Sequence, residues 1–438
     1  MISCTSSGNR IPETIAPAIA ELDSIPVLII RSYFNQHENI SMDELKSGLE
    51  SGSISCTHDI MERLQTKLKL NNKPAVRKLS ELSKIDSSAF MVTSIDSLVP
   101  SYLVTSLNGD HFFRDYSAYA LWVPDTTNRD YTKSITSYTH TGVTALTRST
   151  GSVLNKISIA QYLELIKPEI GNPELLHISN EVSMLETCDY GSMKMKFATK
   201  SDHFKVLEEL GADIIELTGN HNLDVGADAY DATFRWYQAK GMKTFGGGLS
   251  PEEAAAPLIL TLKDGSKIAW IGFNELCPCG ECADKARGSN RYSEALAKST
   301  IEQLKSRGDI TSILACVQFG ETDSYLPTNS QKRISKYLID CGADVVIGSQ
   351  AHQAQTFEWY NNRMIFYGIG NFLFDQIHRP GVRQAYFLEC YFYEGHIVQF
   401  IPHFTFMGTD RRPAPADAGN TQLIKKAIYL PSNLEPSK

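Results

Sequence analysis

The stretch that decides the fold is residues 217–226, Leu-Thr-Gly-Asn-His-Asn-Leu-Asp-Val-Gly. Residues 212–217 before it are rich in β-branched and apolar side chains and follow Gly211, a pattern typical of a short buried strand. Residues 227–240 after it carry aromatic side chains at helical spacing and end at Gly241. The stretch therefore lies on a turn between the carboxyl end of a strand and the amino end of a helix, where ligands bind in open α/β sheets.

Asn220, His221 and Asp224 bring an amide oxygen, an imidazole and a carboxylate to this turn. His221 is able to transfer a proton near neutral pH, with Asp224 fixing its tautomer. The alternative is a capping turn, in which Asn220 or Asp224 accepts hydrogen bonds from the free N–H groups of the following helix. The motif by itself does not decide between the two interpretations.

Length, composition and charge narrow the possible classes of protein. The chain has 438 residues, of which 42% are hydrophobic and 21% are charged, which is typical of a globular protein with two domains or one large domain and a companion. The net charge of −8 and the lack of a basic stripe argue against nucleic-acid binding. The sequence contains no apolar run long enough to span a membrane.

The N-terminus allows two interpretations. Residues 1–20 are expected to form a tether, and Cys4 follows a small residue and precedes a polar stretch, as a lipidated Cys does at the end of a lipoprotein signal. A lipid at Cys4 would be the protein's membrane attachment and would place it outside the cytoplasm. The alternative is a terminus without a targeting role, which leaves a cytoplasmic location open.

The remaining chain divides into three parts. Residues 21–130 are expected to form a small α/β domain, with strands at 27–33 and 119–123 and helices at 41–48 and 58–69, the first beginning with a Ser41–Glu44 capping box. Residues 134–410 form a larger α/β domain, and residues 411–438 form a C-terminal extension. Expected helices of the larger domain are 157–166, 201–210, 300–306 and 329–341, and two long alternating strands, 383–392 and 396–406, are expected to pair antiparallel.

Several successive strands of the larger domain end in polar side chains. These are Glu181, Asn220 with His221, Gln318, Gln350 with His352, and Asn371. Because the carboxyl ends of parallel strands meet at one edge of a sheet, we expect these side chains to converge.

Residues 134–410 resemble the capsule-synthesis CapA family of the poly-γ-glutamate machinery, which belongs to the calcineurin-like metallophosphoesterase superfamily. The resemblance rests on Asn220-His221 with Asp224 and Gly226, on residues 342–348 running to His352, and on residues 368–372, Gly-Ile-Gly-Asn-Phe. It implies a four-layer αββα sandwich with a site at the strand carboxyl ends, and an association with the cell envelope.

The match to the family is uneven at the metal ligands. Where the family has Gly-Asp after its first strand, Gly142 is followed by Val143. Gln318 replaces a His, and Gln350 replaces the first His of the family's His-Pro-His, whereas Glu181 and His352 are kept. A two-metal site needs more ligands than remain, and amides are weaker ligands than imidazoles. We therefore expect a degenerate metal site.

The residues that remain can be assigned expected roles. Glu181, Asn220 and His352 are the candidate ligands of at most one divalent ion (Mn²⁺, Zn²⁺ or Mg²⁺), and a site without metal is equally consistent with the sequence. The candidate catalytic residues are His221, Asp224 and Glu321, and the candidate substrate-binding residues are Arg148, Asn371, Gln318 and Gln350. The alternatives are a surface carboxylate at Glu321, a plain salt bridge at Arg148 and, for the whole set, a hydrogen-bonded network without chemistry.

The cysteines are the last informative feature. Cys277, Cys279 and Cys282 form a C-x-C-x-x-C motif that favours disulfides, one of them to Cys188, over zinc, for which a fourth ligand is not evident. The remaining alternative is a cluster of free thiols in a reducing cytosol. Cys316 and Cys341 lie in apolar contexts and are expected to be buried free thiols.

Two functions fit these observations. The first is a hydrolase-like enzyme that acts on an anionic or peptide-like envelope polymer, as in capsule or poly-γ-glutamate synthesis. The second is a non-catalytic binding or scaffold protein of a capsule assembly, with capsule-export proteins as partners.

Overall fold

The computed structural model describes residues 24–84, 88–193, 196–278 and 280–429. The expected tether at 1–20, with Cys4, and Cys279 of the cysteine motif lie outside these residues. In the part of the chain that is described, each helix is too short or too polar to cross a membrane.

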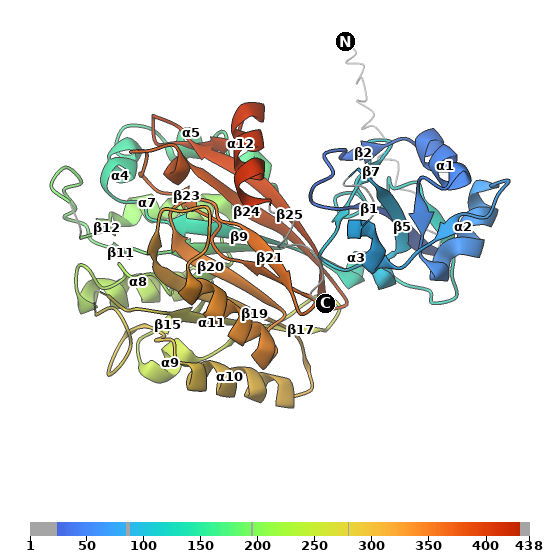
Figure 1. Ribbon diagram of the computed structural model, residues 1–438. Coiled ribbons are helices and arrows are strands. Elements are labelled where there is room, and N and C mark those ends of the chain that lie inside the picture. The colour runs from blue at the N-terminus through green and yellow to red at the C-terminus, as the bar shows by residue number, and fades with distance from the viewer. Residues whose placement is uncertain (1–23, 85–87, 194–195, 279, 430–438) are drawn as a thin grey trace, which may run out of the picture.

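The N-terminal unit is a small mixed sheet with two main helices on it (Figure 1). Its strand order is β4-β3-β5-β1-β6, and β8 also pairs with β1. The bounds are β1 Ser24–Arg31, β3 Ser55–Cys56, β4 Ala75–Val76, β5 Phe90–Ser94, β6 Leu103–Val104, β8 Trp122–Pro124, α1 Met42–Ser51 and α2 Met61–Leu68; a separate pair joins β2 Asn39–Ile40 to β7 Ser106–Leu107. The Ser41–Glu44 capping box is confirmed at the start of α1.

The first sheet of the larger unit has eight strands. Its order is β14-β13-β10-β9-β24-β25-β26, and β23 pairs with β9. The central strands β9, β10, β13 and β14 are parallel, whereas β24 and β25 pair antiparallel as expected. The bounds are β9 Ile135–Thr144, β10 Leu175–Asn180, β13 Ile214–Glu216, β14 Lys243–Phe245, β23 Asn371–Leu373, β24 Gln384–Tyr393, β25 His396–Met407 and β26 Pro413–Pro415.

The second sheet has six strands in the order β16-β17-β19-β20-β22-β21. Its core, β17 to β22, is parallel, and β16 and β21 close its two sides as antiparallel edge strands. The bounds are β16 Leu258–Thr261, β17 Lys267–Asn274, β19 Ile310–Thr322, β20 Val345–Ala351, β21 Phe357–Tyr360 and β22 Arg363–Phe366.

The two sheets face each other across an apolar core, and helices cover their outer faces (Figure 1). Tyr138 and Leu388 of the first sheet pack with Trp270 and Leu314 of the second in one buried cluster. Separate clusters join α7 Ser201–Leu210 and α8 Ala227–Ala239 to the first sheet, and α10 Glu294–Ser306 and α11 Asn329–Cys341 to the second. The α/β class with mixed sheets is thereby confirmed.

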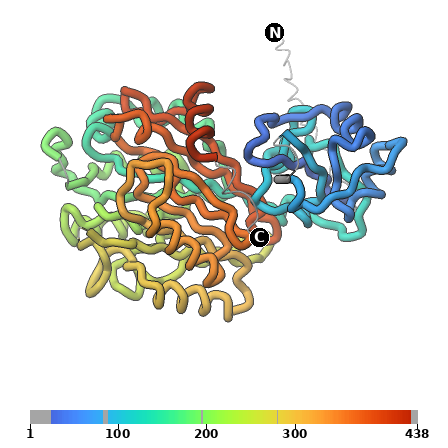
Figure 2. Tube along the Cα trace, viewed as in Figure 1, coloured from blue at the N-terminus to red at the C-terminus, as the bar shows by residue number. Residues whose placement is uncertain are grey.

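The ends of β24 and β25 connect the two units. Tyr391, Tyr393 and Val398 pack into the apolar core of the N-terminal unit, which lies beside these strands in Figure 2. The chain after residue 410 also packs on the sandwich, because β26 pairs with β25 and α12 Ala418–Ile428 buries Ile424 and Ile428.

Helix boundaries differ from expectation at two places. The helix expected at 300–306 begins earlier, at Glu294, because the Ser293 side chain accepts a hydrogen bond from Leu296 N and caps it. The helix expected at 157–166 is shorter, α5 Ile159–Leu163, and a separate short helix, α6 Lys167–Ile170, follows beyond its expected end. Pro168 lies in the first turn of α6, where a backbone N–H has no partner within the helix. In the interior of one continuous helix the same proline would lack a hydrogen bond and clash with the preceding turn.

Gly142 in β9 should be sensitive to substitution. A Cβ atom at this position would lie 2.1 Å from the carbonyl oxygen of Gly370, which also accepts a hydrogen bond from Val143 N. Since backbone atoms give way less readily than side chains, Gly142→Ala should lower the free energy of unfolding by about 1–3 kcal/mol. Urea unfolding should show a lower midpoint at an unchanged slope. Gly191→Ala is the control, because the nearest atom to its Cβ is a side-chain oxygen at 3.5 Å; equal midpoints for the two variants would contradict the prediction.

Candidate functional site

Four polar side chains from both sheets meet in one hydrogen-bonded group, which we call the sheet-edge network. Glu181 follows β10 and Asn220 follows β13 in the first sheet, whereas Gln318 and Gln350 belong to β19 and β20 of the second. Nε2 of Gln318 lies 2.8 Å from Glu181 Oε1, 3.2 Å from Asn220 Oδ1 and 2.6 Å from Gln350 Oε1. All four residues are buried. The structure thus brings these four predicted site residues together.

The centre of this network is a donor nitrogen. Three oxygen atoms surround the Gln318 amide nitrogen as they would surround a bound cation, but an amide N–H₂ donates hydrogen bonds and does not ligate metals. The opposite orientation of the amide would place its oxygen against the Glu181 carboxylate, so the charge of Glu181 fixes the nitrogen inward. Among the described residues, Glu181 Oε2 and Gln318 Oε1 are buried without a hydrogen-bond partner.

Two histidines flank the network, each held by a polar partner. His221 Nδ1 lies 2.7 Å from Asp224 Oδ2, an oxygen that also accepts a hydrogen bond from Phe197 N at 2.8 Å. His352 Nδ1 lies 2.8 Å from Asn371 Oδ1. Burial raises the pKa of Glu181, while the charges that His221 and His352 can carry act in the opposite direction.

Glu321 lies beside His352 but is mostly exposed. Its carboxylate is 3.7 Å from His352 Nε2, and 62% of its side chain is exposed. This exposure matches the surface carboxylate that the sequence left as an alternative.

Aromatic side chains and Arg148 cover the histidines. The Phe197 ring lies 3.9 Å from the His221 ring, and Phe374 lies 5.4 Å from that of His352, measured between ring centres. The Arg148 guanidinium lies over both phenylalanine rings and forms an ion pair with Asp375. Arg148 is thus the half-buried cation of a salt bridge at the rim of the site.

The loop of residues 217–226 is not organised as a capping turn. The residue that precedes α8 is Gly226, and no side chain of the described chain caps this helix. Asn222 Nδ2 instead donates to the carbonyl oxygens of Leu217 and Gly219 and holds the loop from within. Asn220 and Asp224 are therefore left to contact Gln318, His221 and Phe197.

A two-metal centre does not fit this edge. Val143 is buried against Phe197 and Phe374, and the Gln318 nitrogen fills the space among the three oxygens. Among the described residues, one group of three or more His, Cys, Asp or Glu side chains brings its ligand atoms within 4.8 Å of one another, and it lies elsewhere. A single ion on Glu181, Asn220 and His352 stays a prediction and would require the Gln318 amide to turn away.

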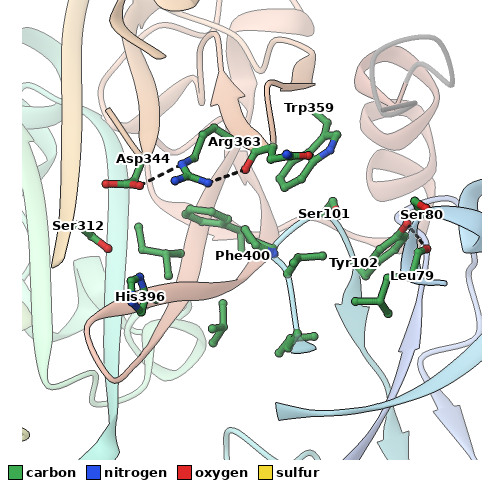
Figure 3. Close-up of a pocket in the computed structure, with 16 residues that line it drawn as sticks. Leu79, Ser80, Ser101, Tyr102, Ser312, Asp344, Trp359, Arg363, His396 and Phe400 are labelled. Carbon is green, nitrogen blue, oxygen red and sulfur yellow. Dashed lines mark hydrogen bonds and ion pairs between the residues drawn. The ribbon is translucent and has the colours of Figure 1, made fainter. Parts of the chain in front are cut away.

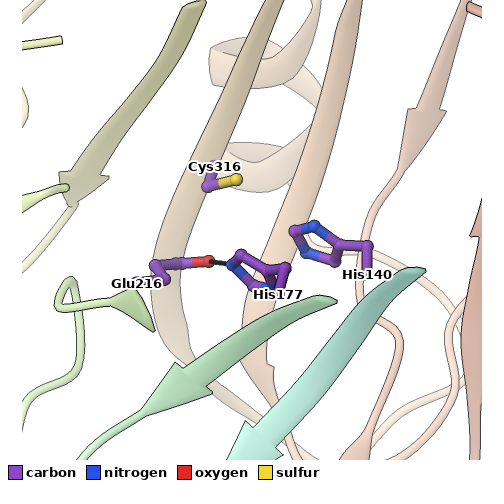
Figure 4. A group of neighbouring side chains, drawn as sticks. All are labelled: His140, His177, Glu216 and Cys316. Carbon is purple, nitrogen blue, oxygen red and sulfur yellow. Dashed lines mark hydrogen bonds and ion pairs between the residues drawn. The ribbon is translucent and has the colours of Figure 1, made fainter. Parts of the chain in front are cut away.

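That other group, which we call the core cluster, consists of His140, His177, Glu216 and Cys316 (Figure 4). It lies between the two sheets, and His177 Nε2 is 3.1 Å from Glu216 Oε2. Burial lowers the pKa of His177 to about 3 and raises the pKa of Glu216, so desolvation favours the neutral form of both. Sequence reasoning missed this cluster, although two histidines in apolar strands were a visible signal.

The cysteine motif forms a disulfide, but with a different pairing from the one expected. Cys277 is bonded to Cys282, and Cys188 is a buried free thiol, so the predicted bond to Cys188 is wrong. The reason is local: Asn274 Oδ1 accepts hydrogen bonds from Leu276 N and Cys277 N and turns the chain back toward Cys282. The prediction for Cys316 is confirmed, since it is buried and free, whereas Cys341 is free and only partly buried.

A cavity of about 470 Å³ lies between the two units (Figure 3). Tyr102 of the N-terminal unit lines it together with Trp359 and Phe400, and Arg363 forms an ion pair with Asp344 at its side. Among the described residues that line this cavity there is no predicted site residue. It is therefore separate from the sheet-edge network.

Comparison with known proteins places the chain in a class of bacterial capsule synthesis proteins. Residues 129–376, more than half of the chain, match the family described as bacterial capsule synthesis protein PGA_cap. The protein therefore belongs to the PGA_cap (CapA) family, as the motifs predicted.

Individual relatives are more distant. The capsule biosynthesis protein CapA of Bacillus anthracis is 26% identical over 182 residues, which cover 41% of this chain and 44% of the relative. The PGA biosynthesis protein CapA of Bacillus subtilis strain 168 is 24% identical over 201 residues, covering 46% and 52%. The chain thus spans about half the length of these curated relatives. Among solved structures, the sulfate thiohydrolase SoxB of Thermus thermophilus matches 65% of this chain and 46% of its own, with 10% identity and a TM-score of 0.36.

The raised pKa of Glu181 predicts a pH effect on stability. A carboxyl whose pKa is higher in the folded than in the unfolded chain destabilises the fold increasingly as the pH rises above the usual Glu value. Glu181→Gln keeps the oxygen that accepts from Gln318 but removes this titration. We therefore expect the variant to gain stability relative to the wild type between about pH 4 and neutral pH.

Urea unfolding at a series of pH values measures this difference. Glu321→Gln is the matched control, because its exposed carboxylate should give a difference that changes little with pH. If the stability gained by Glu181→Gln over the wild type stayed constant or fell as the pH rises, the raised pKa of Glu181 would be contradicted.

Proposed function

We propose that this protein takes part in the synthesis or processing of an anionic, peptide-like capsule polymer of the poly-γ-glutamate type. The support is the family match together with two relatives that are named for capsule and PGA biosynthesis. An extracytoplasmic location fits the Cys277–Cys282 disulfide, since disulfides persist in oxidising compartments. Attachment through a lipid at Cys4 and contact with capsule-export proteins belong to the same proposal.

We also infer that the larger unit is a four-layer αββα sandwich of the metallophosphoesterase type. Two facing mixed sheets with helices on both outer faces support this. In this arrangement the sheet-edge network occupies the position that the family resemblance gives to the metal site.

The proposed role of the sheet edge is to hold polymer without two-metal hydrolysis. The observation that carries this is the Gln318 nitrogen, which occupies the centre of the three oxygens that would otherwise face a cation. Two-metal hydrolysis requires two ions that activate water and stabilise the leaving group. An amide nitrogen that donates hydrogen bonds supplies neither of these effects.

Arg148 is the proposed contact for a carboxylate of the polymer. Its side chain is 22% exposed, whereas the other predicted substrate-binding residues, Asn371, Gln318 and Gln350, are at most 4% exposed. A polymer carboxylate would compete with Asp375 for the guanidinium, which can bind carboxylates with two parallel hydrogen bonds. Because the protein carries a net charge of −8, binding a polyanion depends on such a local cation.

Binding of fluorescent γ-glutamyl oligomers, measured by anisotropy, tests this role. We expect saturable binding that Arg148→Gln weakens about tenfold or more, since hydrogen bonds between charged groups contribute about 1.5–3 kcal/mol. Arg333→Gln is the control, because that arginine pairs with Glu294 on the outer surface of α11. Equal affinities for all three proteins, or release of shortened oligomers that depends on added Mn²⁺, would contradict the proposal.

A second candidate is proton-transfer hydrolysis without metal. The observation that favours it is the contact of His221 Nδ1 with Asp224, which leaves Nε2 free to accept a proton from an attacking water. Asp224 would hold the required tautomer and stabilise the charged imidazole, as carboxylates do beside catalytic histidines.

This second candidate predicts that His221→Asn abolishes cleavage of a γ-glutamyl amide substrate while the unfolding midpoint stays within the range of ordinary surface variants. Asp224→Asn should reduce the rate strongly through loss of tautomer control. His378→Asn, an exposed histidine, serves as the control. Turnover by His221→Asn at the wild-type rate would exclude His221 as the base.

A further inference from the structure

The core cluster has the composition of a metal site and lies away from the sheet-edge network. His140, His177 and Glu216 come from β9, β10 and β13, three adjacent strands of the first sheet, and Cys316 comes from β19 of the second sheet (Figure 4). Each of the four is at most 2% exposed. We propose that these four side chains bind one structural divalent ion, zinc by preference, between the two sheets.

The geometry is close to that of a four-coordinate site. The four ligand atoms lie within 4.8 Å of one another, and His177 Nε2 and Glu216 Oε2 are already 3.1 Å apart. The bond lengths of tetrahedral zinc place its ligand atoms roughly 3.3–3.8 Å from each other. The imidazoles of His140 and His177 lie face to face with centres 3.7 Å apart, so their in-plane lone pairs run nearly parallel and one ring has to turn before both can face one ion.

The surroundings orient the ligands. His140 Nδ1 is 2.7 Å from the Tyr138 hydroxyl, which also accepts a hydrogen bond from Trp270 Nε1 at 3.2 Å. With Nδ1 donating to Tyr138, Nε2 of His140 is free for a metal, the arrangement that outer partners impose on metal-bound histidines. Thr218 donates to the second oxygen of Glu216 and leaves the other toward His177.

A hydrogen-bonded network without metal explains the cluster less completely. In the part of the chain that the structure describes, the side chains of the cluster form hydrogen bonds and ring contacts with Tyr138, Thr218 and Phe245, none of which is cationic. One divalent ion would balance a thiolate and a carboxylate and leave the core electrically neutral.

The ligand types select the metal. One sulfur, two imidazole nitrogens and one carboxylate oxygen suit zinc and other borderline ions, whereas Mg²⁺ and Ca²⁺ prefer oxygen alone. Because all four residues are buried, the site has no open position for substrate, and the ion would enter as the chain folds. The role of the ion would be structural. Because Cys316 and Gln318 lie on the same strand, the ion would link β19 to the first sheet directly below the sheet-edge network.

Zinc analysis of the full chain tests the proposal. The protein is produced with zinc in the medium, its metal content is measured by elemental mass spectrometry, and X-ray absorption at the zinc edge reports the ligands. We expect about one zinc per chain with one sulfur at about 2.3 Å and nitrogen or oxygen atoms at about 2.0–2.2 Å. The sheet-edge network contains no thiol among its described members, so a sulfur signal excludes an ion bound there.

Variants separate the possible results. Cys316→Ser should lose the sulfur signal and most of the zinc, and Glu216→Gln, which keeps the size and an oxygen acceptor, should also lose zinc even if Cys316→Ser does not fold. Cys341→Ser, a free cysteine at the end of α11, should keep both. Wild-type protein that holds no zinc or cobalt after refolding with either ion would overturn the proposal. So would zinc without sulfur that is lost in His352→Ala, a result that would instead place an ion at the sheet edge and contradict the proposed metal-free role there.

Discussion

The face-to-face packing of the two sheets determines where every polar group of the larger unit can lie. Tyr138, Trp270 and their neighbours form one apolar core between the sheets, and the parallel strands of both sheets end at the same edge. An inward-facing polar residue must therefore either find partners inside the core or stand at this edge. The core cluster is the first case and the sheet-edge network is the second. In the latter, the Gln318 amide joins oxygen atoms that belong to both sheets.

The convergence of the strand ends could be predicted from sequence because it depends only on strand direction. In the sequence, Glu181, Asn220, Gln318 and Gln350 each come shortly after an apolar run, and parallel pairing brings such positions together. The orientation of the Gln318 amide could not be predicted, since it is set by which oxygens surround it in space. The predicted helix ends were wrong for local reasons. At Ser293 a capping side chain moves the start of a helix, and at Pro168 a proline interrupts a helical pattern that the spacing of apolar residues would continue.

The core cluster and the disulfide show what a sequence cannot convey. His140 and His177 face inward in apolar strands, where a lone histidine is usually a satisfied core residue. Their meeting with Cys316 depends on how the second sheet stacks on the first, which leaves no periodic signal. The pairing of Cys277 with Cys282 depends instead on one short turn around Asn274. The number of cysteines and their spacing in the sequence do not predict that turn.

Replacing imidazoles by amides changes what the sheet edge is able to do. An imidazole offers a lone pair to a metal or a proton, whereas an amide offers hydrogen bonds of fixed direction and no proton at neutral pH. Gln318 and Gln350 thereby form a set of hydrogen-bond donors and acceptors, and Val143 adds apolar cover where the family resemblance implies a carboxylate. His221 and His352 remain beside this set, with Asp224 and Asn371 holding one nitrogen of each ring. Among the groups described at this edge, the two imidazoles and the Glu181 carboxyl are the ones able to exchange a proton, whereas the amides of Asn220, Gln318 and Gln350 can only orient what those groups contact.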